Sequence, residues 1–159
     1  MIDHELLRDT LDACELHHRR MMFAWERTKT LVPVDPDKYD QLREEDIGYF
    51  DQLIYRFSKL QDAMGNKLFR QILEGLGEET HNIPFIDILN KLEKLNILPD
   101  KDQWLALREL RNEVTHEYPS RPGLIAEGLN ELHEQAVTLS NIWQEVKNYT
   151  LKRFHLILP

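Results

Sequence analysis

Apolar residues recur at steps of three or four along nearly the whole chain, which is the spacing of one face of an α-helix. No stretch alternates apolar and polar residues for long enough to predict a β-strand. We therefore predict an all-α protein, an antiparallel bundle of about five helices of which two are long. The 159 residues form one domain over 1–159, because this length suits a single core.

The helix boundaries are predicted from prolines, glycines and capping residues. The first long helix is expected over about 3–30 and the second over about 44–74, where Gly75 ends it. Between them, Asp35 followed by Pro36 is typical of an N-cap and the first residue of a short helical turn.

Three further helices complete the predicted bundle. One begins near Pro84, and the next begins at Asp100, within a sequence that resembles a capping box. The last helix has the clearest apolar stripe, which consists of Ile125, Leu129, Leu132, Ala136, Leu139, Trp143 and Val146. An apolar C-terminal tail, assigned to 151–159, follows this helix. Long helices in a short chain leave wide apolar flanks, so we expect self-association.

Composition narrows the functional classes. The net charge is −8, from 20 Lys and Arg against 28 Asp and Glu, which argues against a protein that coats nucleic acid non-specifically. Cys14 is the single cysteine, so an internal disulfide and a cysteine-based zinc site are both excluded. The chain has no apolar run of the roughly 18 residues that a membrane span needs, and its first residues lack the pattern of a secretory signal. We expect a cytoplasmic protein without a membrane partner.

The seven histidines do not form a metal-binding motif, and we expect neither a metal nor a cofactor. His17 and His18 are adjacent, so they project to different sides of a helix. His18 lies on the apolar stripe and is expected in the interior or at an interface, whereas His133 is expected on the flank of the last stripe. His81 lies in a predicted turn.

Residues 108–119 combine side chains that suit phosphodiester chemistry at a predicted helix end. Arg111 can hold a phosphate with two hydrogen bonds and stabilise developing negative charge. His116 can transfer protons near neutral pH. Asn112 and Tyr118 can orient the substrate or each other.

The same side chains have structural interpretations. Arg111 can interact with the helix dipole, His116 can cap the last carbonyls, and Tyr118 can be a half-buried aromatic residue. An arginine followed five positions later by histidine is expected by chance about half a time in such a chain. The full pattern Arg111-Asn112-x3-His116-x-Tyr118 has a chance expectation of roughly one in a thousand and is therefore informative.

An all-helical chain of this length with that motif at the end of its penultimate helix resembles the HEPN family. The resemblance is to small prokaryotic ribonuclease toxins that are paired with a minimal nucleotidyltransferase antitoxin. The segment 55–62, Tyr-Arg-Phe-Ser-Lys-Leu-Gln-Asp, also resembles the second helix of such proteins.

The resemblance implies a homodimer in which two motifs meet in a shared cleft. It implies catalytic roles for Arg111 and His116 and auxiliary roles for Asn112 and Tyr118, the latter also a position where the antitoxin attaches AMP in some members. The implied reaction is metal-independent cleavage of RNA, and DNA is not a substrate because it lacks the 2′-hydroxyl.

On one straight helix, Arg111 and His116 would lie about 140° apart. They can act on one phosphate only if the helix ends between them or a second copy supplies one of them. Two other functions stay open: a non-catalytic subunit that binds nucleotide or substrate for a nucleotidyltransferase, and a helical interaction protein whose apolar tail docks a partner. The roles of four further residues are left open: Arg56, Asp62, Arg108 and Arg121.

Overall fold

The structure, a computed structural model, describes residues 3–116 and 120–158, and these residues contain helices and connecting segments only. The predicted all-α bundle is confirmed. The helices are α1 (His4–Thr28), α2 (Pro36–Gln41), α3 (Glu44–Ala63), α4 (Phe69–Gly75), α5 (Phe85–Lys94), α6 (Lys101–Val114) and α7 (Pro122–Arg153), and a π-helical turn, η1 (Met64–Leu68), joins α3 to α4.

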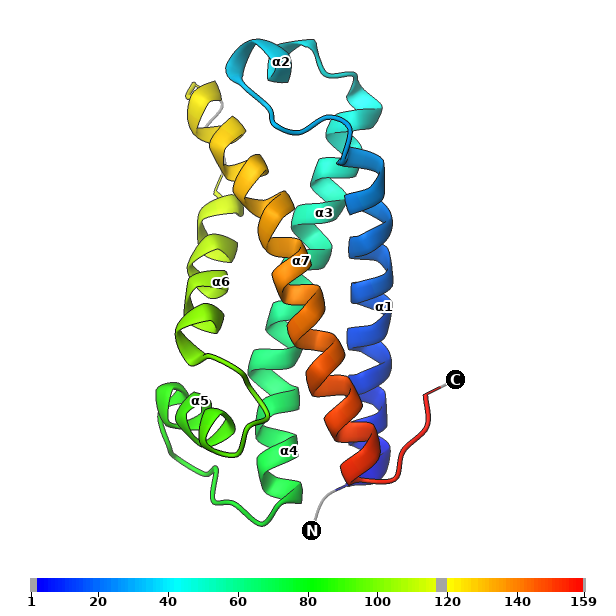
Figure 1. The fold of residues 1–159 in the computed structure, drawn as a ribbon, viewed down its shortest axis with the longest axis vertical. Coiled ribbons are helices and arrows are strands. Elements are labelled where there is room, and N and C mark those ends of the chain that lie inside the picture. Colours follow the sequence, from blue (N-terminus) through cyan, green and yellow to red (C-terminus); the bar gives the residue numbers. More distant parts are fainter. Residues whose placement is uncertain (1–2, 117–119, 159) are drawn as a thin grey trace.

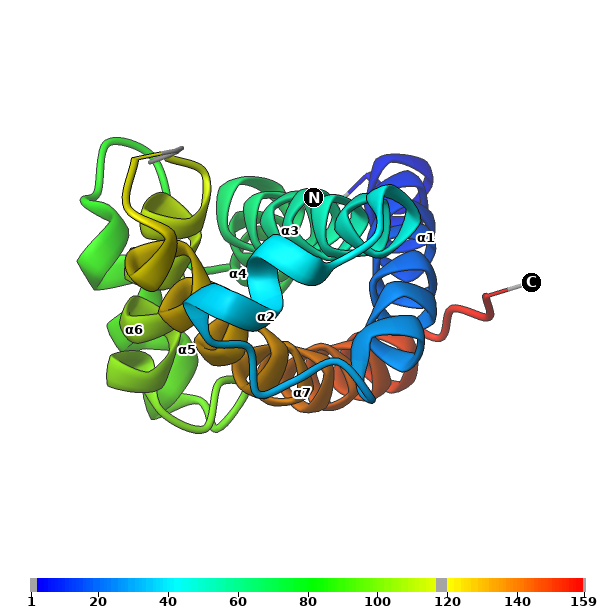
Figure 2. The same ribbon diagram turned by 90° about the horizontal axis from the view of Figure 1, so that it is seen from above.

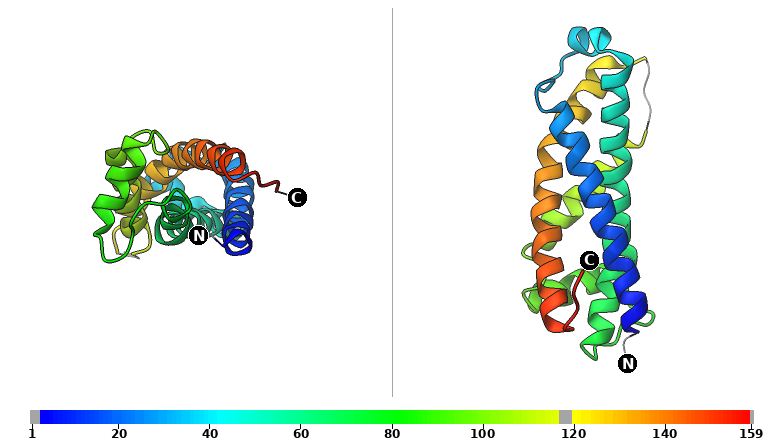
Figure 3. Two further views of the ribbon diagram at one scale, coloured as in Figure 1. Left: turned by 90° about the horizontal axis from the view of Figure 1, so that it is seen from below. Right: turned by 90° about the vertical axis from the view of Figure 1, so that its right-hand side faces the viewer.

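Three long helical runs form the body of the bundle: α1, the run from α3 through η1 to α4, and α7 (Figure 1). α3 and α7 run opposite to α1 and α6. Figure 2 shows α1, α3, α6 and α7 arranged around the core, with α2 lying across the top. In the right panel of Figure 3, α1 lies between α7 and α3, and it packs against both.

Two boundaries differ from the prediction. α7 is a third long helix of 32 residues, and it includes residues 151–153, so the apolar tail begins only at Phe154. The predicted helix over 44–74 forms as one run, but a π-helical turn interrupts its α-helical geometry at Met64–Leu68.

The predicted stripes form the core because their apolar side chains point inward from every long helix. Trp104 of α6 and Trp143 of α7 are its largest fully buried side chains. Burial of one large apolar side chain contributes about 1.5–3 kcal/mol, so the stripes supply much of the driving force for folding. No helix in residues 3–116 and 120–158 combines the length and the apolar character that crossing a membrane requires.

The predicted caps are present. The Asp35 carboxylate accepts a hydrogen bond of 2.8 Å from the backbone N–H of Lys38, with Pro36 as the first residue of α2. The Asp100 carboxylate accepts one of 2.8 Å from the backbone N–H of Asp102 at the start of α6. These bonds satisfy N–H groups that the first helical turn leaves unpaired.

The interior histidine predicted at position 18 is confirmed: His18 is buried, with Nε2 2.7 Å from Oγ of Ser140. His133 was expected on a flank, but it is buried. Its ring stacks on Trp25 with centroids 4.6 Å apart, and the Trp25 Nε1–H donates to the His133 carbonyl over 2.9 Å. Stacking on the Trp25 indole provides a favourable contact for the imidazole ring in the core.

Candidate active site between α3 and α6

Arg111 lies in the last turn of α6 and points toward α3. Its Nη2 donates to Oδ2 of Asp62 over 2.9 Å, and its Nη1 donates to Oδ1 of Asn112 over 3.1 Å. Its Nε is buried and has no hydrogen-bond partner among the described residues. The guanidinium is therefore half-buried and oriented by α3, with one N–H donor unsatisfied. In native structures, a buried donor without a partner usually belongs to a functional group or binds a water molecule.

α6 ends between Arg111 and His116, which is one of the two arrangements that would let both act on one phosphate. The last helical residue is Val114, Thr115 is the C-cap, and the backbone N–H of His116 donates to the Glu113 carbonyl over 3.2 Å. Because the chain leaves the helix after Val114, the direction of the His116 side chain is no longer tied to that of Arg111 by helical geometry.

His116 is exposed and lies where α3, α6 and α7 come together. It lines a hollow of about 480 Å³ whose α3 side includes Asp51, Ile54 and Tyr55. It also lines a groove of about 910 Å³ between α6 and α7, which carries five glutamates: Glu109, Glu113, Glu127, Glu131 and Glu134. This acidic groove repels phosphates more strongly than the hollow on the α3 side of His116, whose lining contains one carboxylate, Asp51.

The segment 55–62 of α3 and the motif residues at the end of α6, which carry the family resemblance, lie near each other. Asp62, the last residue of the segment 55–62, pairs with Arg111, while Tyr55, its first residue, lines the hollow that contains His116. Asp62 follows Tyr55 by seven positions, which is roughly 10 Å along the axis of a helix. Asp62, the partner of Arg111, and Tyr55, which lines the hollow of His116, are therefore about two helical turns apart on α3.

Comparisons of the chain with models of known families, with curated proteins and with solved structures found no match. Membership of the HEPN family therefore stays a prediction that depends on the motif and on the resemblance of the segment 55–62.

The structure separates the remaining candidate residues. Asn112 is exposed and holds Arg111, whereas Tyr118 lies outside the described residues. Of the four residues left open, only Asp62 contacts Arg111 through a hydrogen bond or ion pair that the structure shows. The other three lie elsewhere: Arg56 bonds His17, Arg108 lies over the Phe85 ring, and Arg121 is the N-cap of α7.

A small polar hollow of about 200 Å³ next to Asp62 was not predicted. Its lining is rich in hydrogen-bond donors and consists of Gln61, Asp62, Gly65, Asn66, Arg70, Phe85, Trp104 and Arg108. Gln61 is buried, and its Nε2 has no partner among the described residues. The available signal in the sequence was a polar residue, Gln61, on an otherwise apolar stripe. A Cβ on Gly65, in the π-helical turn, would lie 3.4 Å from the Trp104 ring, which is ordinary van der Waals contact.

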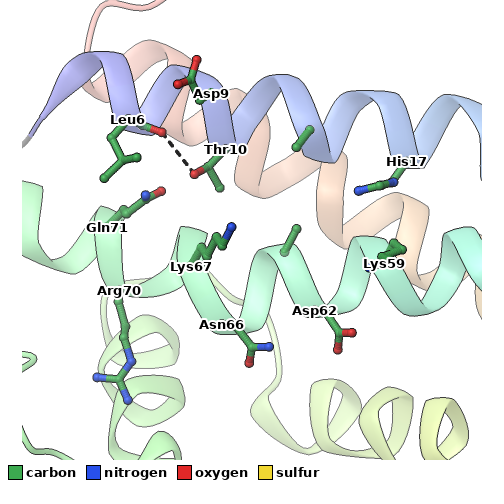
Figure 4. Close-up of a pocket in the computed structure, with 12 residues that line it drawn as sticks. Leu6, Asp9, Thr10, His17, Lys59, Asp62, Asn66, Lys67, Arg70 and Gln71 are labelled. Atoms are coloured by element: carbon green, nitrogen blue, oxygen red, sulfur yellow. Dashed lines mark hydrogen bonds between the residues drawn. The ribbon is translucent and has the colours of Figure 1, made fainter.

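A larger hollow of about 640 Å³ is lined by α1, α3, η1 and α4, and it shares Asp62, Asn66 and Arg70 with the small polar hollow (Figure 4). The figure shows Asp62 and Asn66 pointing away from α1, toward the α6 side. His17 of α1 lies on the Lys59 side of this hollow, and burial together with the positive charges of Arg56 and Lys59 lowers the pKa of His17. Across residues 3–116 and 120–158, no three His, Cys, Asp or Glu side chains gather in a way that could hold a metal ion.

Proposed function

We propose that the protein is an endoribonuclease toxin that cleaves RNA without a metal ion, with Arg111 and His116 acting in a dimer cleft. The observation that carries the proposal is that the segment 55–62 of α3 supplies both Asp62, the ion-pair partner of Arg111, and Tyr55, which lines the same hollow as His116. The end of α6 at Val114, between Arg111 and His116, is a second supporting observation.

The proposed reaction is an intramolecular transesterification. His116 removes the proton of a ribose 2′-hydroxyl, and the resulting oxyanion attacks the adjacent phosphorus. The P–O5′ bond breaks, the 5′-oxygen leaves and takes up a proton, and the other product carries a 2′,3′-cyclic phosphate. Arg111 stabilises the charge on the non-bridging phosphate oxygens, and Asp62 orients its guanidinium.

The spacing along α3 favours a site that two chains share. Asp62, which pairs with Arg111, and Tyr55, which lines the hollow of His116, are roughly 10 Å apart along α3, which is long for two groups that act on one phosphate. A two-fold dimer would bring Arg111 of one protomer to His116 of the other and would place two arginines around one linkage. This arrangement helps an acidic protein to hold a polyanion at one local site.

A minimal nucleotidyltransferase is the proposed antitoxin, and AMP attached to Tyr118 is its proposed means of silencing the toxin. Tyr118 follows His116 by two residues, so a modification there would place an added phosphate next to the proton-transferring group. This part of the proposal rests on the family resemblance alone.

The test compares wild type with Arg111→Ala and His116→Ala, and it uses Arg8→Ala and His81→Ala as matched controls on exposed positions. The assay follows a labelled single-stranded RNA with the purified proteins and growth of a bacterial host that expresses them. Loss of His116 is expected to reduce the cleavage rate about 10²–10⁴-fold, and loss of Arg111 about 10²–10³-fold. The controls should cleave like wild type.

The end group of the product provides a second measurement, because the proposed chemistry predicts a 2′,3′-cyclic phosphate. If wild type and both site variants leave growth and RNA equally intact, the nuclease proposal is wrong. Nucleotide binding by wild type without any cleavage would instead support the alternative, a non-catalytic partner subunit of a nucleotidyltransferase.

A further inference from the structure

The face formed by α1 and α3 combines exposed aromatic rings with guanidinium groups. Its hollow, about 710 Å³ in volume, is lined by Arg19, Arg20, Phe23, Asp51, Gln52, Tyr55 and Arg56, which we call the α1–α3 face. Phe23 and Tyr55 each expose 48% of their surface, which is high for large aromatic residues. Asp51 is the one carboxylate among these lining residues.

Cations lie over both exposed rings. The Arg56 guanidinium is 5.0 Å from the centre of the Tyr55 ring, and the Lys59 ammonium is 5.6 Å from it. The Arg27 guanidinium is 5.0 Å from the centre of the Phe23 ring. The positive charge of this face contrasts with the net charge of −8 and with the five glutamates of the groove between α6 and α7.

The α1–α3 face leads to the candidate catalytic residue. Asp51 and Tyr55 line both its hollow and the hollow that contains His116. A ligand that crosses Tyr55 from α1 therefore reaches His116 without passing the acidic groove on the other side. Gln52, whose Nε2 donates to the Arg20 carbonyl over 3.0 Å, fixes α3 against α1 beneath this path.

We propose that the α1–α3 face binds single-stranded RNA and directs it toward His116. Arginines 19, 20 and 56 would contact the phosphates, and bases would stack on Phe23 and Tyr55. Stacking on aromatic side chains combined with a positive groove is the usual means of holding a single strand, whereas a duplex hides the faces of its bases. The direction of the strand toward His116 rests on the proposed nuclease function, but the binding surface itself does not.

A second copy of the chain is a less suitable occupant of this face. In a two-fold interface centred here, the same arginines of both protomers would oppose each other, which is unfavourable for association. A polyanion complements this charge, and it can displace a cation from one side of the Tyr55 ring by stacking.

The test measures binding of a fluorescently labelled 12-nucleotide RNA by anisotropy, in full-length protein carrying His116→Ala so that the RNA is not cleaved. In this background, Tyr55→Ala and Phe23→Ala are expected to raise Kd by about 5- to 100-fold each. Tyr55→Phe keeps the stacking surface and should bind like the parent. Arg20→Gln should reduce the dependence of log Kd on log salt concentration by about 0.7.

The controls are Ile157→Ala, at an exposed position in the tail, and Arg153→Gln, at the end of α7; both should leave Kd within about twofold of the parent. Circular dichroism and thermal unfolding establish that each variant is folded. An unlabelled RNA duplex of the same length should compete less well than the single strand.

The outcomes separate this inference from the proposed function. If the α1–α3 face variants bind RNA like the parent, the inference is wrong, and cleavage by wild type is unaffected. If these variants lose binding while wild type cleaves no RNA, the binding face stands and the nuclease proposal fails. If the parent does not bind RNA and Tyr55→Ala turns a dimer into a monomer in sedimentation, the face is an interface between copies, and the inference is overturned.

Discussion

The candidate catalytic residue Arg111, on α6, forms an ion pair with Asp62 on α3. The side chains of Arg111 and Asp62 expose 33% and 38% of their surface. An ion pair this accessible to water contributes about 0–1 kcal/mol to stability. Asp62 therefore has little structural value, and we expect that it serves to position the guanidinium.

Asp62→Asn tests this positioning role because it keeps the shape of the side chain and removes its charge. We expect kcat for RNA cleavage to fall about 10- to 100-fold, since Arg111 is no longer held in one orientation. KM should not rise, because the uncompensated arginine attracts phosphate at least as well. Urea unfolding should show a loss below about 1 kcal/mol.

Asp12→Asn, on the exposed side of α1, is the matched control and should change neither constant. A higher KM with kcat unchanged would contradict the positioning role, because Asp62 would then act in substrate binding.

At the residue scale, the sequence predicts candidate site residues but not their contacts. The motif predicts Arg111 and His116 as site residues, and residues a few positions apart stay close in space. The partner of Arg111 could not be deduced, since Asp62 is 49 residues away and ion pairs of this kind have no sequence signature. The unsatisfied Nε2 of Gln61 could not be deduced either, because it depends on the packing of α3 against α6.

At the scale of helices, the segment between α1 and α2 is attached to α7 by one side chain. The Asn130 Oδ1 accepts a hydrogen bond of 2.6 Å from the Val34 N–H, and its Nδ2 donates one of 2.8 Å to the Val34 carbonyl. An amide side chain here replaces a backbone partner and satisfies both polar groups of a buried residue.

Asn130→Ala should therefore destabilise the protein by about 1–3 kcal/mol, because it leaves a buried N–H and a buried C=O without partners. Chemical denaturation measures the free energy of unfolding. Asn141→Ala on the exposed side of the same helix is the control and should change it by less than about 0.5 kcal/mol. If both variants lose the same amount, the effect comes from α7 itself and the attachment of Val34 is unimportant.

Helix ends were largely predictable, whereas the π-helical turn was not. Prolines, glycines and the caps Asp35 and Asp100 act locally, so the sequence alone places α2 and the start of α6. The apolar stripe continues through Met64 and Leu68 at the same steps of three or four, so its period contains no sign of η1. Gly65 of this turn lies close to the Trp104 ring, a tertiary contact that the sequence pattern does not contain.

For the whole molecule, the distribution of charge matters more than its sum. The net charge of −8 averages over the arginine-rich α1–α3 face and the glutamate-lined groove between α6 and α7, which face different directions. The composition argues against a protein that coats nucleic acid non-specifically. The separation of the two charged surfaces could not be predicted from it, because that separation depends on how four helices are arranged. His116 lies at the boundary between them.

Stability of the whole fold should depend on pH through its buried histidines. Burial lowers the pKa of His18 below its ordinary value of 6.5; nearby Glu15 partly opposes this and Lys147 adds to it. Burial also lowers the pKa of His133, opposed in part by the Trp25 carbonyl. In the unfolded chain both rings take up a proton near pH 6.5, whereas the folded protein keeps them neutral to lower pH.

The unfolded state therefore binds more protons as the pH falls below about 6.5, and the free energy of unfolding should decrease between pH 7 and pH 5. Each histidine contributes at most about 1.4 kcal/mol per pH unit. His18→Gln keeps a hydrogen-bonding group near Ser140 but cannot titrate, so its urea midpoint should depend less on pH than that of wild type. An unchanged pH dependence in His18→Gln would show that His18 is not among the groups responsible.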